Sequence, residues 1–245
     1  MRARPPVPRK ALVKFKSVMD VELVQQLAAD EMVCMAARVS TIGNTPQTYT
    51  REKNAGLINF LMRDRHGSPF EHGSFTFRIS APIFVCREFM RHRAGMSYNE
   101  ESGRYRELEP VFYVPPGNRP LVQVGRAGKY DFQPGTFRQD LVAGEALRMA
   151  YTEAWTQYQT MLGEGIAREV ARTVLPVGTY STFYVTCNPR SLMHFLSLRT
   201  KSDGATYKSF PQVEIQMVAD QMEEHFKTHM PMTHDTFVKH GRVAP

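Results

Sequence analysis

Residues 91–105 constrain the fold most, because these fifteen residues hold three arginines, one histidine and two carboxylates but almost nothing apolar. A segment of this composition cannot anchor a hydrophobic core, so neighbouring elements must support it as a loop. Guanidinium groups are always charged and match phosphate or carboxylate oxygens two at a time. Gly95 and Gly103 allow the backbone to approach a ligand closely. We therefore expect this segment to bind an anion such as a phosphate ester.

A second interpretation of the same charges stays open at this point. Runs of charged residues are commonly solvated surfaces whose members pair with one another. Four acidic residues in or near the segment could pair with its arginines, namely Glu88, Glu100, Glu101 and Glu107. Charge alone does not decide between a ligand site and a solvated loop.

The size and composition are those of a globular protein with a sizeable core. The chain has 245 residues, of which 42% are hydrophobic and 22% charged, and we expect a single domain over residues 1–245. Residues 1–16 are basic and proline-containing and are predicted to form a flexible arm. Because this arm carries six of the positive charges, the rest of the chain is close to neutral despite a net charge of +7. A general nucleic-acid-binding protein, the rival class, is therefore disfavoured.

The sequence also bears on the compartment. No apolar run follows the basic residues and none approaches the roughly 18 residues of a membrane span, so a cytoplasmic protein is expected. Its three cysteines are scattered, which indicates reduced thiols rather than disulfides.

Hydrophobic periodicity predicts an alternation of helices and strands. Strands are expected over 74–80 and 179–186, and a short apolar piece over 111–114. The stretch 115–135 is rich in proline and glycine and is predicted to be irregular. Helices are expected over 21–39, 54–63, 82–90, 136–162, 166–174, 189–199 and 210–229. The apolar and aromatic stripe along 136–162 is expected to be core rather than a cofactor site.

Other chemistries find little support in the residue pattern. His225 and His229 share one helix face, and His234 and His240 follow, but no carboxylate completes a recognised metal motif, so no metal is expected. Cys86 and Cys187 lie in apolar stretches and are interpreted as small core residues rather than nucleophiles. The sequence contains neither a glycine-rich dinucleotide fingerprint nor a P-loop.

Arg91-His92-Arg93, followed after eight residues by Ser102-Gly103-Arg104, resembles the signature of the flavin-dependent thymidylate synthases. In that family the pattern usually reads Arg-His-Arg, seven residues, Ser. The additional residue falls among Ala94, Gly95 and Met96. Glu88 stands where the family often has glutamine, and His194 where it often has asparagine. Further blocks resemble the family in the same order, at residues 36–40, 66–72, 81–85, 168–176 and 188–199.

The resemblance implies an α+β fold with a central, mostly antiparallel sheet flanked by helices. It implies a homotetramer whose active sites are each assembled from more than one subunit. The implied reaction is the reductive methylation of dUMP to dTMP, a methyltransferase step of nucleotide biosynthesis. Its carbon donor is 5,10-methylenetetrahydrofolate, NADPH is the reductant, and FAD carries the hydride. No cysteine nucleophile is required.

The resemblance also assigns residues. Arg199 is the implied catalytic residue, a fixed cation that stabilises negative charge developing on the uracil oxygens. Arg104, Arg172 and the Ser102 hydroxyl would hold the phosphate of dUMP. The implied dUMP site comprises Glu88, Arg91, Glu101, Ser102, Gly103, Arg104, Arg172 and Arg199. The implied FAD site comprises Ser40, His66, Ser68, Arg91, His92, Arg93, Glu100, Asn188, Arg190 and His194.

Overall fold

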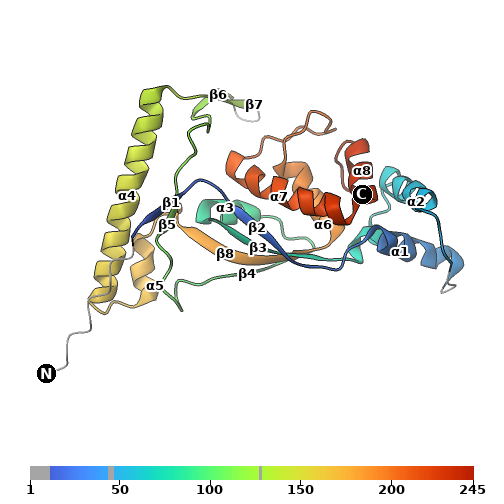
Figure 1. The fold of residues 1–245 in the computed structure, drawn as a ribbon, viewed down its shortest axis with the longest axis horizontal. Helices are drawn as coiled ribbons and strands as arrows, with labels where there is room; N and C mark the ends of the chain where they lie inside the picture. Colours follow the sequence, from blue (N-terminus) through green and yellow to red (C-terminus); the bar gives the residue numbers. More distant parts are fainter. Residues whose placement is uncertain (1–11, 44–46, 127–128) are drawn as a thin grey trace. The chain divides into compact units, whose positions relative to one another are not determined.

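The computed structural model describes residues 12–43, 47–126 and 129–245 (Figure 1). The described residues form two compact units. Unit 1 contains 12–18, 80–87 and 100–182, and unit 2 contains 19–79, 88–99 and 183–245. The single domain expected from the sequence stays a prediction.

Unit 1 begins with a strand where the sequence predicts the end of a flexible arm. Residues 1–11 of that arm lie outside the described residues. β1 (Lys14–Lys16) pairs in parallel with β5 (Val111–Tyr113). The arm prediction is therefore wrong for these three residues, because β5 supplies a partner that the local composition does not reveal.

The predicted irregular stretch 115–135 contains a second departure. β6 (Val122–Arg126) and β7 (Lys129–Gln133) form an antiparallel hairpin. Gly125 has φ +86°, a backbone conformation that glycine adopts at little cost, at the end of the hairpin. The glycines and prolines of residues 115–135 therefore do not exclude regular structure in this stretch.

The long helix of unit 1 matches its prediction. α4 (Phe137–Gly163) is capped by Thr136, whose side chain and Gln139 form a reciprocal capping box. Tyr151, Trp155 and Tyr158 are buried in one cluster with Phe112 of β5. The Tyr151 and Phe112 rings stack with centroids 5.1 Å apart. The aromatic stripe is confirmed as core.

The predicted helix over 166–174 is shorter and divided. α5 (Arg168–Ala171) runs directly into a 3₁₀ turn, η2 (Arg172–Val174). Pro176 follows and prevents the helix from continuing. Within the described ranges, no helix combines the length and apolar character needed to cross a membrane.

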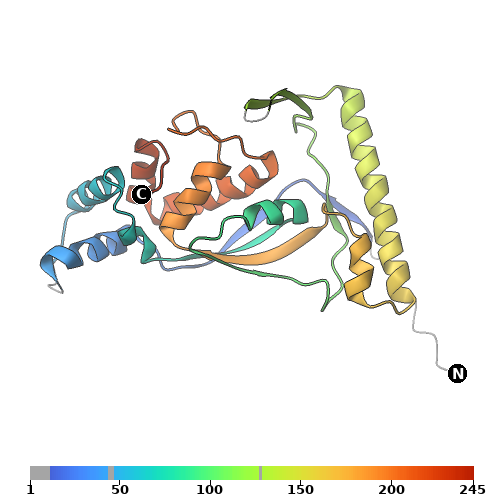
Figure 2. The same ribbon diagram turned by 180° about the vertical axis from the view of Figure 1, so that it is seen from behind.

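Unit 2 contains most of a four-stranded, mostly antiparallel sheet, as the predicted α+β class requires. Its strands occur in the order β2 (Asp20–Gln26), β3 (Phe75–Pro82), β8 (Tyr180–Cys187) and β4 (Met96–Glu100). α6 (Pro189–Arg199) and α7 (Val213–His229) lie over one face of this sheet in both views (Figures 1 and 2). Further elements are α1 (Asp30–Ile42), α2 (Arg51–Arg63), η1 (Ser68–Glu71), α3 (Ile83–Phe89) and α8 (Pro231–Lys239).

The helix predicted over 21–39 is wrong for its first part, which is β2. Burial alternates along β2, and Leu27 N donates to Ser74 O beyond its end, as in a strand beside β3. α1 then starts at Asp30, whose buried carboxylate accepts from the backbone N–H groups of Met232 and Thr233 at 2.8 and 2.9 Å. Asp30 thereby caps α8, a helix that the sequence analysis did not predict.

Candidate active site

The arginine-rich segment is held against the start of α6. After α3 ends at Phe89 the chain turns, and β4 begins at Met96. The Ser191 hydroxyl donates to Ala94 O at 2.9 Å. Gly95 has φ +65°, and a Cβ there would lie 2.2 Å from Ser191 Oγ. The stretch that carries the additional residue therefore requires glycine both for its backbone conformation and for its close approach to α6.

Aromatic side chains pack against the turn between α3 and β4. The Tyr98 hydroxyl donates to His92 O at 2.5 Å. Its ring meets Phe89 edge-on at 6.0 Å, and Phe89 packs on Phe195 of α6 at 4.4 Å. His92 in turn lies edge-on to Phe195 at 4.9 Å. The exposed, charged segment thus rests on a rigid apolar base, and its histidine side chain has a defined position.

Arg199, the predicted catalytic residue, is held on two sides. Its Nη1 lies 2.5 Å from Glu88 Oε1, and its Nε donates to His92 Nε2 at 2.9 Å. The Arg199 and Glu88 side chains are only 20% and 23% exposed. Because partial burial strengthens this ion pair, the guanidinium is fixed in orientation before any ligand arrives. The three predicted residues Glu88, His92 and Arg199 are brought together.

The contact with Arg199 determines the protonation state of His92. A nitrogen that accepts from a guanidinium cannot carry a proton, so His92 is neutral, with its proton on Nδ1. Burial and the neighbouring charges of Arg199 and His194 lower the pKa of His92 to about 4. At neutral pH the imidazole is therefore an uncharged group beside a fixed cation.

This shift predicts how stability depends on pH. Between pH 6.5 and 4 the unfolded chain protonates His92 and the folded chain does not, so the free energy of unfolding falls as the pH falls through this window. The loss approaches about 3 kcal/mol below pH 4. Denaturant unfolding of the wild-type protein and of His92→Gln, measured between pH 7 and 4, should show a difference that shrinks by this amount. A difference independent of pH would contradict a depressed pKa.

Arg91 and Arg93 have no acidic partner among the described residues. Of the acids proposed to neutralise the segment, Glu88 pairs with Arg199, Glu100 accepts from the Ser181 hydroxyl, and Glu101 lies 3.7 Å from Arg106. Both arginines are exposed. The pairing expected in the second interpretation is therefore wrong for these two cations, which are exposed and available to bind an anion.

Two of the blocks predicted to bind FAD meet in unit 2. Arg190 of α6 lies over Gly67, where a Cβ would come within 2.5 Å of its guanidinium carbon. The same guanidinium donates to Glu71 Oε1 and Pro245 O, both at 2.6 Å. Asn188 caps α6 as predicted, its side chain accepting from Ser191 N at 2.8 Å. Gly67 and Arg190 thus join the segment 66–72 to the start of α6.

The other predicted FAD residues differ in their surroundings. His66 and Ser68 are exposed on either side of Gly67, and His194 is exposed on α6. The Ser40 hydroxyl donates to Ala37 O within α1, so it bonds to its own helix. Glu100 belongs to unit 1, unlike the other nine residues.

The donor set fits a flavin dinucleotide. Arg91 and Arg93, which have no acidic partner in the described part of the chain, are cations of the kind that bind a diphosphate. The N-terminus of α6 adds the positive end of a helix dipole. Gly67 leaves the guanidinium of Arg190 space against the backbone.

The predicted phosphate-binding residues of dUMP meet in unit 1. Ser102 begins a tight turn, in which its carbonyl accepts from Tyr105 N at 3.0 Å and its hydroxyl from Arg104 N at 3.3 Å. A Cβ on the buried Gly103 would lie 3.2 Å from Arg172 Cδ. The side chain of Arg172 therefore lies against the turn that contains Ser102, Gly103 and Arg104.

Glu101 stands apart from this group in its role. Its backbone N–H donates to Thr182 O at 2.9 Å, and its carboxylate accepts from Thr182 N at 2.9 Å. These two bonds tie the segment to β8. Arg104 lies 3.4 Å from Glu169 at the surface, a weak contact that a stronger anion can replace.

Each unit also holds a cavity that the sequence did not predict. In unit 1 a cavity of about 400 Å³ is lined by Lys14, Lys16, Glu101 and Arg106 among others. In unit 2 a cavity of about 710 Å³ lies against α1, whose Met32, Met35 and Val39 line it with Tyr49. The wall of the unit 1 cavity joins residues that are far apart in the sequence, whereas the wall of the unit 2 cavity comes from residues 32–43, residues 47–49 and His72.

The residues of the rejected chemistries have ordinary structural surroundings. Cys34, Cys86 and Cys187 are buried, and burial raises the pKa of their thiols to about 11, 12 and 12. His225 and His229 lie beside the rings of Phe77 and Phe75. Within the described part of the chain, no three His, Cys, Asp or Glu side chains gather as metal ligands would.

Comparison with known proteins identifies the family. Residues 22–232 match the family model described as thymidylate synthase complementing protein. The flavin-dependent thymidylate synthase of Streptomyces coelicolor is 57% identical over 95% of this chain and 96% of its own. That of Tropheryma whipplei strain TW08/27 is 53% identical over 94% of this chain and 97% of its own.

Solved structures agree with these relatives. A UMP/dUMP methylase from Streptomyces cacaoi, bound with 5-Br dUMP, superimposes with a TM-score of 0.91 at 50% identity, covering 95% of this chain and all of its own. The same methylase bound with 5-Br UMP gives a TM-score of 0.88. With its Arg-His-Arg segment, its α+β fold and these relatives, the chain belongs to the family of flavin-dependent thymidylate synthases.

Proposed function

We propose that this chain catalyses the reductive methylation of dUMP to dTMP, with 5,10-methylenetetrahydrofolate as carbon donor and NADPH as reductant. The observation that carries the proposal is Arg199, a partly buried cation fixed by Glu88 and by a neutral His92. For C5 of the uracil to attack the carbon donor, the ring has to become electron-rich, and the negative charge that it gains lies largely on its carbonyl oxygens. A preorganised cation stabilises that charge without reorganising as it forms.

FAD, when bound, carries the hydride from NADPH. Arg91 and Arg93 would hold its diphosphate, and Asn188 and Arg190 would place it at the start of α6. Ser40, His66, Ser68, His92, Glu100 and His194 complete the proposed FAD site. Because the flavin supplies the redox chemistry, the chain has to supply position and electrostatic field.

Substrate binding is assigned to the turn after β4. Ser102 and the backbone N–H groups around Gly103 would bind the phosphate of dUMP, with Arg104 and Arg172 neutralising it. Glu88 and Arg91 would lie near the base and the ribose, and Glu101 would act by tying the segment to β8.

A homotetramer with shared active sites accompanies this proposal. Its support is the resemblance to the family, which implies active sites that are each assembled from more than one subunit. The cytoplasmic location stays a prediction from the sequence.

The visible spectrum of the purified protein tests the proposal. We expect flavin bands near about 370 and 450 nm, which bleach on anaerobic addition of NADPH and bleach faster with dUMP present. Addition of the carbon donor should then yield dTMP. A colourless protein that takes up no added FAD would overturn the proposal and leave the segment as a phosphate site without redox chemistry.

UMP is a second candidate substrate, because the methylase from Streptomyces cacaoi is described as acting on UMP and dUMP. The same assay run with UMP decides between them. Turnover of UMP at a rate comparable to that of dUMP would widen the proposed substrate to both nucleotides.

A further inference from the structure

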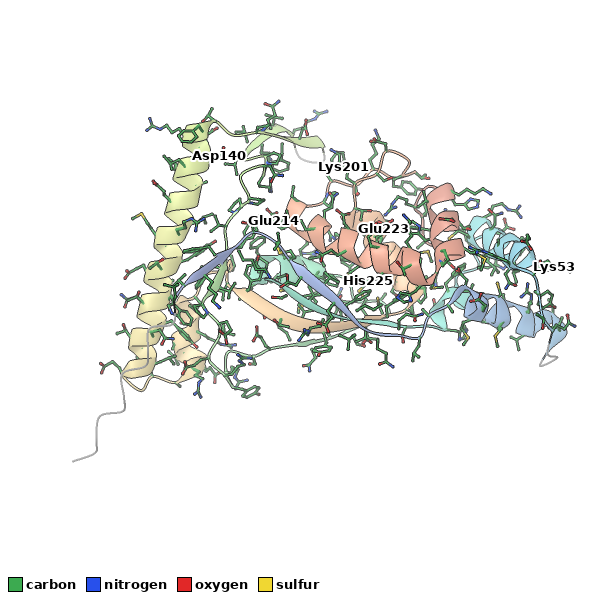
Figure 3. The ribbon with its side chains drawn as sticks, in the orientation of Figure 1. Lys53, Asp140, Lys201, Glu214, Glu223 and His225 are labelled. Atoms are coloured by element: carbon green, nitrogen blue, oxygen red, sulfur yellow. The ribbon has the colours of Figure 1, made fainter. Side chains whose placement is uncertain are left out.

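A buried ionic cluster that the proposed function does not use contacts Thr200, the residue that follows Arg199. Arg242 is 7% exposed, and its two terminal nitrogens bind the two oxygens of Glu223 at 2.7 and 2.6 Å. Glu223 comes from α7 (Figure 3), and one of its oxygens also meets His234 Nε2 at 2.9 Å. Burial alone would raise the pKa of Glu223, but the hydrogen bonds from His234 and Arg242 outweigh it and hold the pKa at about 2. The ion pair therefore stays charged at any working pH.

A third hydrogen bond joins this cluster to α6. Arg242 Nη2 also donates to Thr200 Oγ1 at 2.7 Å. Thr200 is 5% exposed and is the residue after Arg199. Its hydroxyl donates its one proton to Leu196 O at 2.7 Å, so a lone pair of the oxygen can accept from the guanidinium. The last turn of α6 is thereby bound to α7 by a buried charge.

The backbone at Arg242 is built to present the side chain in this way. Its φ of +57° is uncommon for a residue other than glycine. Arg242 N donates to Phe237 O at 2.9 Å, and Gly241 O accepts from Thr206 N at 2.9 Å. The hydrogen bonds at Arg242 and Gly241 hold this unfavourable backbone conformation. Such conformations are usual where a side chain has to be held in one defined position.

We propose that Arg242, acting through Thr200, is a positioning residue for Arg199. The inference rests on the proposed function. The Arg199 guanidinium is oriented at its far end by Glu88 and His92, while its backbone is the last turn that Thr200 ends. If that turn moves, the guanidinium no longer meets both partners and the uracil oxygens together. A displacement of about 1 Å can cost as much as about 100-fold in rate.

The ion pair of Arg242 with Glu223 could also serve only to stabilise the fold. The test therefore has to separate a stabilising role of Arg242 from a positioning role. Thr200→Val removes the hydroxyl and keeps the shape. Thr236→Val is the matched control, because Thr236 is 7% exposed and its hydroxyl donates to Met232 O at 2.7 Å, the same intrahelical bond without the arginine. Thr200→Ser retains the hydroxyl and should restore activity.

Steady-state dTMP formation and melting temperature are measured for each variant. We expect Thr200→Val to lower kcat about tenfold while KM for dUMP changes less than about twofold, because Arg199 acts on charge that develops during reaction. Thr236→Val should retain the wild-type kcat. In an Arg199→Lys background, Thr200→Val should lower kcat no further, because the effect passes through Arg199.

The outcomes are distinguishable. Equal kcat values for Thr200→Val and Thr236→Val, or a full tenfold loss in the Arg199→Lys background, would overturn the positioning role. Should Thr200→Val fail to fold, Arg242→Lys takes its place, since an ammonium on a flexible stem lacks the planar pair of nitrogens with which Arg242 binds Glu223 and Thr200. An unchanged kcat in that variant would equally overturn the inference. A wild-type protein that makes no dTMP overturns the proposed function itself.

Discussion

Replacing Arg199 by alanine is expected to lower kcat for dTMP formation by about 100- to 1,000-fold at saturating dUMP. The guanidinium is fixed by Glu88 at 2.5 Å and by His92 at 2.9 Å, so it meets developing charge without the cost of reorientation. The loss should appear in kcat more than in KM, because the charge on the uracil is larger in the transition state than in bound dUMP.

Two comparisons make the Arg199 experiment decisive. Arg199→Lys keeps the positive charge but loses the planar guanidinium with its separate donor nitrogens. Its rate should therefore lie between those of Arg199→Ala and the wild-type protein. Arg78→Ala removes an exposed arginine of the same unit, which pairs with Glu22, and should leave kcat unchanged. A near-normal rate for Arg199→Ala at saturating dUMP would refute the catalytic assignment.

Replacing Arg172 by alanine is expected to weaken dUMP binding by about 10- to 100-fold, the worth of a charge-assisted hydrogen bond to phosphate. Arg172 lies against Gly103, the residue whose backbone we assign to the phosphate. The dissociation constant for dUMP, measured by titration calorimetry, should rise while kcat at saturating dUMP falls much less.

The phosphate explains why Arg172 should act on affinity. The negative charge of the phosphate is the same in the ground state and the transition state, so the contact contributes to both equally. Arg138→Ala, which removes an exposed arginine of α4 in the same unit, provides the control for net charge. An unchanged dissociation constant in Arg172→Ala would remove Arg172 from the phosphate site.

Local signals predicted some elements because their causes are local. Asn188 caps α6 through a bond to Ser191, three residues away, and Thr136 caps α4 in the same manner. The aromatic stripe of α4 repeats at helical spacing and is buried accordingly. These patterns lie within a few residues of each other, so the sequence displays them directly.

The errors arose where a partner strand or helix overrode local preference. Residues 20–26 contain helix-compatible side chains but form β2 in the sheet. β1 and the β6–β7 hairpin likewise depend on pairing with another strand. Strand formation is decided by such contacts more than by intrinsic preference.

The sequence by itself determined the family and the chemistry, because the arginine-rich segment and its accompanying blocks are specific in residue type and order. Only the tertiary structure decided how the side chains act. It paired Arg199 with Glu88 across 111 positions and tied Thr200 to Arg242 across 42. It also made His92 a neutral acceptor by burying it beside a cation. Contacts over such separations follow from the packing of the whole unit, which no local spacing encodes.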